Sequence, residues 1–323
     1  MPLRSTDAGI TDFGSKTSGS AFLVAGNYAT CGGGDNNQIG DNLNGADYST
    51  ICGGRNNTVS GTVLNGVICG GLGNTLNVGG SSSFIGAGTN NIAGGIRCVI
   101  GGGNNNACNG AQSVVCGGDG NIATGVGATV GGGTGNFATA DGSCIPGGIS
   151  NSAPSRASFA SGEQAGAIRA TQYAHASGMS HGSVAGQGSA QYGRLIYSGG
   201  IPGVAGAESV VLKTNSSAND FVPEPNKSYI FTLSVIATKS NVAGGAEAAA
   251  GVKQDFVVTC SLAGLTLIPG YVPAPFFGDA TVTGSTITPN GGASILTLNF
   301  QGPVAAIKLD VAATLEWTEI LHN

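Results

Sequence analysis

The 323-residue chain is poor in charged residues. They make up 9% of the sequence, whereas about a quarter is usual for a soluble protein, and there is no lysine between Lys16 and Lys213. With 41% hydrophobic residues this composition would suit a membrane protein, but Gly, Asn and Ser interrupt every apolar run before it reaches about twenty residues. A net charge of −5 without a basic stripe argues against a nucleic-acid partner. We therefore expect neither membrane insertion nor nucleic-acid binding.

Residues that would support catalysis are also scarce. No Gly-x-Ser-x-Gly elbow occurs between a strand and a helix, and the glycines at 101–103 recur without the helix that follows a phosphate-binding loop. Glycoside hydrolysis requires two positioned carboxylates, and the acids of the first half are scattered along it. They are Asp35, Asp41, Asp47, Asp119, Asp141 and Glu163. The sequence therefore predicts a protein that is not an enzyme and holds no cofactor.

Asparagine recurs along the first half at nearly constant intervals. The spacings are 20, 17 and 17 residues and then 15. A fixed period is the sequence mark of stacked supersecondary units. The eight positions are Asn37, Asn57, Asn74, Asn91, Asn106, Asn121, Asn136 and Asn151. Because Asn tolerates a positive φ better than most residues, we expect these eight to form a ladder of turn residues.

The length of the repeat limits what it can fold into. Fifteen residues allow two short strands and two tight turns, at about 3.3 Å per strand residue. An Ile, Val or Cys stands six residues before each Asn, as Ile100 does before Asn106, and supplies an inward side chain. So thin a coil buries too little apolar surface to offset the chain entropy by itself. We therefore predict that the rod associates with other copies.

The repeat texture resembles a known family. The stretch from Asn106 to Gly118, Asn-Ala-Cys-Asn-Gly-Ala-Gln-Ser-Val-Val-Cys-Gly-Gly, is similar to the head repeats of trimeric autotransporter adhesins. The Gly-Gly-Gly form at 131–133 looks more like the variant found in phage and other viral fibres. The resemblance implies a left-handed parallel β-roll with three chains packed about one axis. It covers about half of the chain.

Seven of the eight cysteines lie in the repeats and follow no CxxC pattern. Cys52, Cys69 and Cys116 share one register, in which other repeats place glycine. Adjacent strands are about 4.8 Å apart, so Cys52 and Cys69 are expected to be stacked neighbours. We interpret these cysteines as small buried residues that pack as weak hydrophobes, with a disulfide or a metal as the alternatives.

The texture changes near residue 194, where Pro, charge and large apolar residues return. Alternation over 229–238 and 309–317 predicts strands. Further strand candidates, separated by Pro, Gly and Asn, are 209–214, 252–260, 281–288 and 293–300. Six or more strands without an amphipathic helix predict an antiparallel β-sandwich or jelly-roll. The expected fold is therefore all-β, with an N-terminal segment at 1–30, a β-roll rod at 31–193 and a β-sandwich at 194–323.

This second half has a resemblance of its own. The order Ala174-His-Ala-Ser-Gly178, then Gly186-Gln-Gly-Ser-Ala-Gln191, a Pro-Asn-Lys-Ser-Tyr-Ile-Phe strand and Leu315-Glu-Trp317 is similar to the C-terminal domain of phage tail-fibre and tailspike-like proteins. This resemblance covers roughly residues 170–321. It marks the fold and implies no functional residue.

Two small groups of residues are candidates for binding. His175 or His181 would meet its copies on a trimer axis and there hold an ion, but the spacing does not match the HxH of such fibres, so we assign no metal site. The loop at 269–278 is apolar and Pro-rich, and aromatic rings on a loop favour recognition. Its Tyr271, Phe276 and Phe277 are the candidate receptor-binding residues, with a core or interface role as the alternative.

These observations predict a non-enzymatic viral fibre, from a phage, located on the virion surface. Its trimeric rod would present a C-terminal domain that binds a host-surface glycan or protein, and its N-terminal segment would bind other virion proteins. The alternatives are a bacterial cell-surface adhesin and a structural or ice-binding rod. The beginning of the chain, Met1 to Gly9, has no apolar core of a signal peptide, which counts against the adhesin.

Overall fold

In the computed structural model, every element of the residues that the structure describes is a β-strand. The structure describes residues 11–12, 23–41, 45–177, 190–202, 209–211, 227–239, 249–261, 264–267, 277–278, 286–291, 296–301 and 308–321. The chain divides into two compact units, Met1–Ile168 and Arg169–Asn323. The all-β prediction is confirmed.

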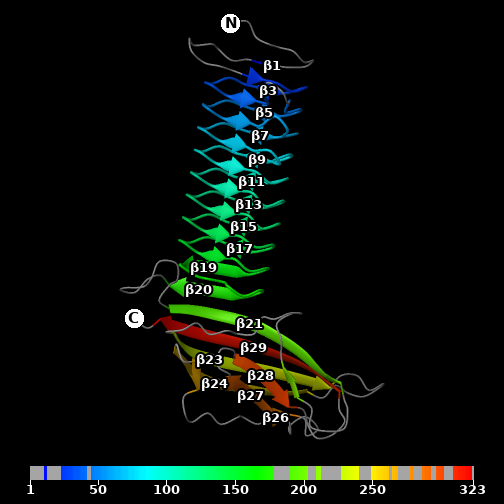
Figure 1. Ribbon diagram of the computed structural model, residues 1–323, viewed down its shortest axis with the longest axis vertical. Coiled ribbons are helices and arrows are strands. Elements are labelled where there is room, and N and C mark those ends of the chain that lie inside the picture. Colours follow the sequence, from blue (N-terminus) through cyan, green and yellow to red (C-terminus); the bar gives the residue numbers. More distant parts are fainter. Residues whose placement is uncertain are drawn as a thin grey trace. The chain divides into compact units, whose positions relative to one another are not determined.

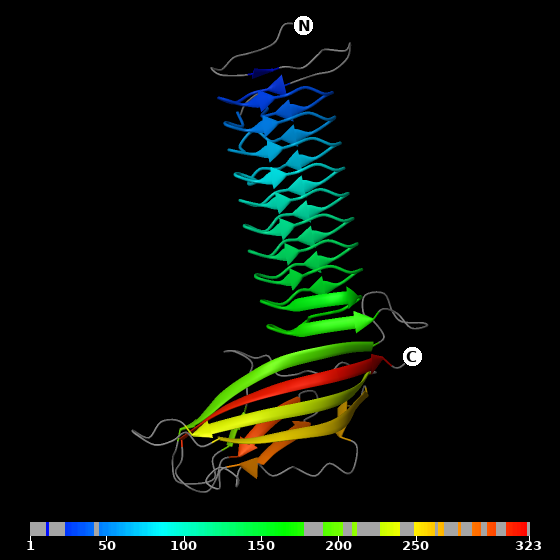
Figure 2. The ribbon, with the colours of Figure 1, turned by 180° about the vertical axis from the view of Figure 1, so that it is seen from behind.

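The first unit is a parallel β-solenoid in which each coil contributes one short strand to each of two sheets (Figure 1). The odd-numbered strands form the first sheet: β1 (Thr11–Asp12), β3 (Thr30–Cys31), β5 (Thr50–Ile51), β7 (Val67–Ile68), β9 (Phe84–Ile85), β11 (Val99–Ile100), β13 (Val114–Val115), β15 (Thr129–Val130), β17 (Cys144–Ile145) and β19 (Phe159–Glu163). The even-numbered strands form the second: β2 (Leu23–Val24), β4 (Gln38–Ile39), β6 (Thr58–Val59), β8 (Thr75–Leu76), β10 (Ile92–Ala93), β12 (Ala107–Cys108), β14 (Ile122–Ala123), β16 (Phe137–Ala138) and β18 (Ser152–Ala153). Figure 2 shows the same stack from behind.

The core is one residue deep on each side. In the first sheet, residues such as Ile51, Ile85 and Ile145 are fully buried, and the facing positions of the second sheet change from Ile39 and Leu76 to alanine toward the C-terminal coils. Side chains alternate along a strand, so the second residue of each pair is buried and the first faces outward. Each coil therefore buries one or two large side chains.

The eight asparagines are buried as well, at 0–1% exposure. Their expected positive φ is wrong, because it belongs to the residue before each of them. Those residues are Asn36, Asn56, Gly73, Asn90, Asn105, Gly120, Gly135 and Ser150. The asparagine side chain instead enters the coil and hydrogen-bonds to backbone groups. A residue that turns the chain therefore precedes a residue that ties neighbouring coils together.

Small residues fill the coil interior just before the first-sheet strands. This buried column contains Ser49, Ser83, Cys98, Ser113, Ala128, Ser143 and Ser158. Ser113 links the two inward thiols of its neighbourhood, since its Oγ lies 3.0 Å from the Sγ of Cys108 and 3.5 Å from that of Cys98. The hydrogen bond with Cys98, together with burial, raises the pKa of the Cys108 thiol, so this thiol packs as a neutral small group.

The second unit contains antiparallel sheets. The larger comprises β20 (Tyr173–Ser177), β21 (Ala190–Pro202), β29 (Lys308–Leu321), β23 (Lys227–Lys239), β24 (Ala249–Ser261), β25 (Gly264–Leu267) and β26 (Phe277–Gly278). The smaller comprises β22 (Ser209–Val211), β28 (Leu296–Gln301) and β27 (Thr286–Gly291). Trp317 of β29 pairs with Gly193 on one side and Phe231 on the other. The packing of these sheets as a sandwich remains a prediction.

Candidate functional site

Two outward-facing columns run along the solenoid, one on each sheet. Strand pairing sets their register, so that Val67, Phe84 and Val99 are consecutive partners in the first sheet. Face A consists of Thr30, Thr50, Val67, Phe84, Val99, Val114, Thr129, Cys144 and Phe159. Face B consists of Gln38, Thr58, Thr75, Ile92, Ala107, Ile122, Phe137 and Ser152.

Both faces expose large apolar side chains in the middle of the stack. The exposed fractions are 38% for Phe84 and 37% for Val99 on face A, and 38% for Ile92 and 40% for Phe137 on face B. Single exposed hydrophobic residues are normal, whereas aligned ones that form a continuous patch mark interaction surfaces. Neither face contains a charged residue.

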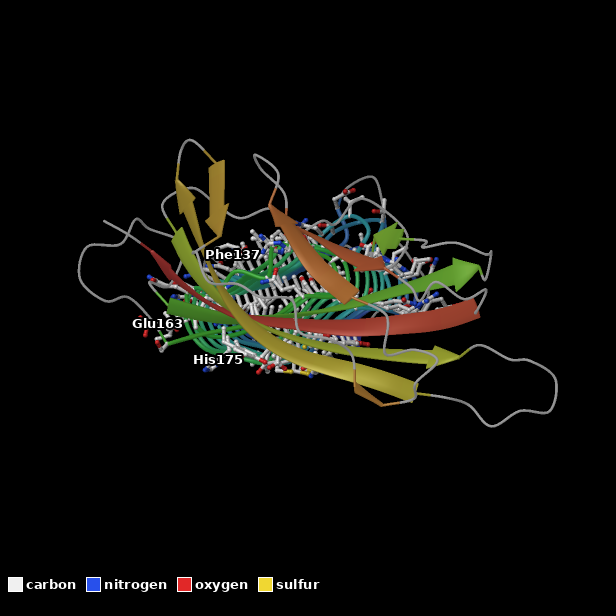
Figure 3. The ribbon with its side chains drawn as sticks, turned by 90° about the horizontal axis from the view of Figure 1, so that it is seen from below. Phe137, Glu163 and His175 are labelled. Carbon is white, nitrogen blue, oxygen red and sulfur yellow. The ribbon has the colours of Figure 1, made fainter. Side chains whose placement is uncertain are left out.

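The charged residues of the solenoid between positions 23 and 168 lie outside faces A and B. They are Asp35, Asp41, Asp47, Arg55, Arg97, Asp119, Asp141, Arg156 and Glu163, and Glu163 is the last residue of β19. Figure 3, viewed along the stack, shows Phe137 on a broad side of the coils and Glu163 at their narrow end. The coil thus presents two uncharged broad faces, and its charged residues lie outside them.

One edge is a ladder of parallel bridges with no gap between coils. Its members are Asp35, Arg55, Leu72, Thr89, Asn104, Asp119, Thr134, Ile149 and Glu163. Neighbouring side chains of this ladder also interact, since Nδ2 of Asn104 donates to Oδ1 of Asp119 at 2.9 Å.

Carboxylates along this bridge ladder do not form a pair. Asp119 and Glu163 are three coils apart, which corresponds to about 14 Å at the spacing of adjacent strands. Two glycosidase carboxylates lie about 5–9.5 Å apart, so this pair does not meet the requirement within one chain. In the described coils and strands, no group of three or more His, Cys, Asp or Glu forms a metal site, and no helix is long and apolar enough to cross a membrane.

The opposite edge has two stacked tyrosines at one end. The rings of Tyr28 and Tyr48 have centroids 5.2 Å apart and planes 13° from parallel, and each residue is 58% exposed. Both adopt a φ of 57°, which is rare and costly for a bulky residue. Asp47 supports the turn beside them, because its Oδ1 accepts a hydrogen bond from the backbone N–H of Asn27 at 2.7 Å.

The same turn recurs in every later coil with a less apolar or smaller residue. The corresponding positive-φ positions are Asn65, Ser82, Arg97, Gln112, Gly127, Gly142 and Ala157. Sequence reasoning missed the tyrosine pair, although their separation of 20 residues equals the first asparagine spacing. The combination of exposure and ring stacking makes Tyr28 and Tyr48 the candidate recognition residues of the solenoid.

The loop predicted to bind a receptor lies mostly outside the described residues. Tyr271 and Phe276 are outside them, and Phe277 belongs to β26, where it pairs with Gly251 of β24. His175 is exposed on β20, and His181 lies outside the described residues.

The predicted burial of the three cysteines in one register is wrong. Cys52, Cys69 and Cys116 are all exposed. Each follows an inward residue and therefore points outward beside face A. The prediction failed because successive side chains of a strand point to opposite faces, and these three residues are at positions that point outward.

Comparison with known proteins found no matching family and no similar curated protein. Two solved structures show some similarity to the chain. One is the tailspike protein gp49 of Acinetobacter baumannii bacteriophage Fri1, a capsular polysaccharide depolymerase, which is 8% identical over 91% of this chain and 68% of its own, with a TM-score of 0.21. The other is the tailspike protein of Acinetobacter phage vB_ApiP_P1, 10% identical over 88% of this chain and 68% of its own, also with a TM-score of 0.21.

These findings correct one expectation from the sequence. The predictions of a non-enzymatic fibre and of a protein that is not an enzyme are contradicted, because a structure similar to this chain belongs to a capsular polysaccharide depolymerase. The prediction depended on the scarcity of paired acids within a single chain. Because both TM-scores are 0.21, no residue of these two structures is assigned to a position in this chain.

Proposed function

We propose that the chain is a tail protein of a phage virion, of the fibre or tailspike type, that assembles as a homotrimer and engages a host-surface polysaccharide. The observation that carries this proposal is the pair of uncharged, partly apolar faces that run along the solenoid, one on each sheet. Broad faces that carry no charge and expose apolar side chains are suited to association along the length of a rod.

Assembly follows from the thinness of the coil. Each coil buries few large side chains, whereas Phe84 and Val99 on face A and Ile92 and Phe137 on face B stay partly exposed in the single chain. Copies that pack through these faces remove that apolar surface from water and stabilise the rod, at about 25 cal/mol per Å² buried. When face A of one chain packs against face B of the next, the chains close into a ring if the rotation between them allows it. The sequence resemblance implies a ring of three chains.

The polysaccharide is supported by the tyrosine pair. Aromatic rings provide an apolar surface with a polar hydroxyl, which suits the mixed apolar and hydroxyl surface of a sugar. Both rings are exposed and stack on each other, and no later coil of the described solenoid has an aromatic residue at this turn. Three such pairs in a trimer would act together on a repeating polymer and raise the apparent affinity.

The remaining parts of the chain complete the proposal. The segment before the first coil serves as the attachment toward other virion proteins, and the solenoid up to Ile168 serves as the rod. The unit from Arg169 onward adds contacts to the host surface through Tyr271, Phe276 and Phe277. Binding and cleavage of the polysaccharide are both activities of the assembled protein in this proposal.

The test uses the full chain and pairs of bacterial strains that differ only in their capsule. We expect the protein to sediment with capsulated cells of at least one strain and not with the capsule-deficient partner, and we measure new reducing ends in the purified capsule to report cleavage. The variant Tyr48→Ala should weaken binding several-fold, whereas Gln112→Ala, at the same turn of a later coil, should not. Equal sedimentation with both partners of every pair would contradict the proposal.

A further inference from the structure

The outward cysteines differ in their neighbours. Cys52 and Cys69 follow the paired residues Ile51 and Ile68 of β5 and β7, and the backbone N–H of Cys52 donates to the carbonyl of Ile68 at 2.9 Å. The two cysteines therefore occupy the same register in adjacent coils. Both are exposed.

This arrangement meets the basic geometric requirement of a disulfide. Neighbouring strands lie about 4.8 Å apart, and disulfides join Cα atoms separated by about 4.4–6.8 Å. The two side chains leave the sheet on the same side, so their Cβ atoms do not point apart. Neither coil has to move far for the sulfur atoms to bond.

We propose that Cys52 and Cys69 form an oxidisable dithiol that closes to a disulfide between two adjacent coils of the solenoid. The oxidant is a small disulfide of the glutathione type. A thiolate of the pair attacks it and forms a mixed disulfide with release of one thiol. The second cysteine then displaces the second thiol, so that two protein thiols are oxidised and one small disulfide is reduced to two thiols.

The consequence is a covalent staple across one coil. The bond closes the segment between positions 52 and 69, which is one complete turn of the solenoid. Parallel coils are otherwise held by hydrogen bonds and by a thin core, and unravelling begins most easily at the ends of such a stack. A staple near the N-terminal end of the rod would oppose that unravelling after the protein leaves a reducing compartment.

Cys116 provides a matched control within the same chain. It is exposed and occupies the same outward position after Val115, but Gly101 and Gly131 stand at this position in the two adjacent coils. Within the described coils of one chain, Cys116 therefore has no thiol at the equivalent outward position of either neighbouring coil. It should remain free under conditions that oxidise the pair.

The test is oxidation of the full-length protein with glutathione disulfide, followed by alkylation in denaturant and peptide mapping by mass spectrometry. The expected result is a peptide that links Cys52 to Cys69 within one chain, with Cys116 alkylated. Cys52→Ser and Cys69→Ser should each abolish the link, and Cys116→Ser should leave it intact. If the wild-type pair is fully alkylated, or if its cysteines are linked between chains on a non-reducing gel, the proposal is wrong.

Discussion

The backbone N–H of Asn121 donates a hydrogen bond of 2.9 Å to Oδ1 of Asn106 in the neighbouring coil. The same contact joins Asn106 to the preceding coil, because the backbone N–H of Asn106 donates to Oδ1 of Asn91 at 3.0 Å. Its Nδ2 donates to the carbonyl of Gly102 at 3.0 Å and to that of Gly118 at 2.9 Å. Asn106 therefore bonds to the coils on both sides, with its side-chain amide in its own and the following coil and with its backbone N–H to the preceding coil.

Replacing Asn106 with Val should destabilise the rod. The substitution removes both Nδ2 donors and leaves the N–H of Asn121 unpaired, and a buried unsatisfied group costs about 1–3 kcal/mol. We expect the free energy of unfolding to fall by about 3 kcal/mol in a denaturant titration. The control is Asn105→Gly, since Asn105 already has a φ of 53°, and glycine adopts this conformation readily. Equal unfolding midpoints for wild type and Asn106→Val would show that the asparagine ladder does not hold the coils.

Gly118 should tolerate no side chain. A Cβ at this position would lie 2.1 Å from the carbonyl oxygen of Gly133 and 2.6 Å from Nδ2 of Asn121, at a φ of +90°. Gly118→Ala is expected to lower the thermal midpoint by several degrees or to prevent folding, because backbone of the adjacent coil cannot yield without breaking the ladder.

Gly120 offers the comparison for this prediction. Its φ is +64° and a Cβ there would meet no atom within 4 Å, and Asn occupies the equivalent turn position at Asn90 and Asn105. Gly120→Asn should therefore leave the thermal midpoint nearly unchanged. A larger loss for Gly120→Asn than for Gly118→Ala would contradict the packing described here.

A charge on face A or face B should disturb assembly. Phe84 and Phe137 are similarly exposed, at 38% and 40%, and one lies on each sheet. A lysine buried in a contact between copies would be desolvated without a partner, so Phe84→Lys or Phe137→Lys should shift the sedimenting species to lower mass. Val78→Lys is the control, because Val78 is 72% exposed and lies outside both columns. Unchanged mass for both phenylalanine variants would exclude these faces as contacts.

The closure of the dithiol should be slow at neutral pH and faster in alkaline solution. Burial, followed by the charge and hydrogen bond of the neighbouring Cys52, raises the pKa of the Cys69 thiol. The thiolate is the attacking species, so its fraction, and with it the rate of linkage by glutathione disulfide, increases as the pH rises toward the shifted pKa. Quenched samples taken at several pH values measure this rate. A rate that falls with increasing pH would contradict the assignment.

The sequence predicted the repeat more successfully than the role of its residues. The repeat length predicts two strands per coil, and the recurring Ile, Val or Cys six residues before each Asn predicts the buried column of the first sheet. Only one residue of each short strand points inward, because side chains alternate along a strand. The function of the asparagines did not follow, since a positive φ and a buried amide ladder both favour Asn, and only the backbone shows that Asn105 turns while Asn106 is buried. The outward phase of Cys52 was missed for a similar reason, because small residues are compatible with either side of a thin sheet.

The candidate recognition residues were harder to identify from the sequence. Tyr28 and Tyr48 are 20 residues apart, and nothing in their local sequence indicates that the rings stack at a strained turn. Sequence reasoning favoured the aromatic loop of Tyr271, Phe276 and Phe277 because aromatic residues on a loop between strands are a familiar recognition signal. Stacking of residues distant in sequence depends on coil register, which the uneven first spacings of 20 and 17 residues obscure.

The central claim is that this solenoid functions as an assembly of three chains. Sedimentation equilibrium of the full-length protein over a range of micromolar concentrations tests it directly. The account predicts a single species of about 94 kDa, three times the 31.4 kDa of one chain, whose mass does not change on dilution. A folded species of 31.4 kDa that persists across the same range would contradict it.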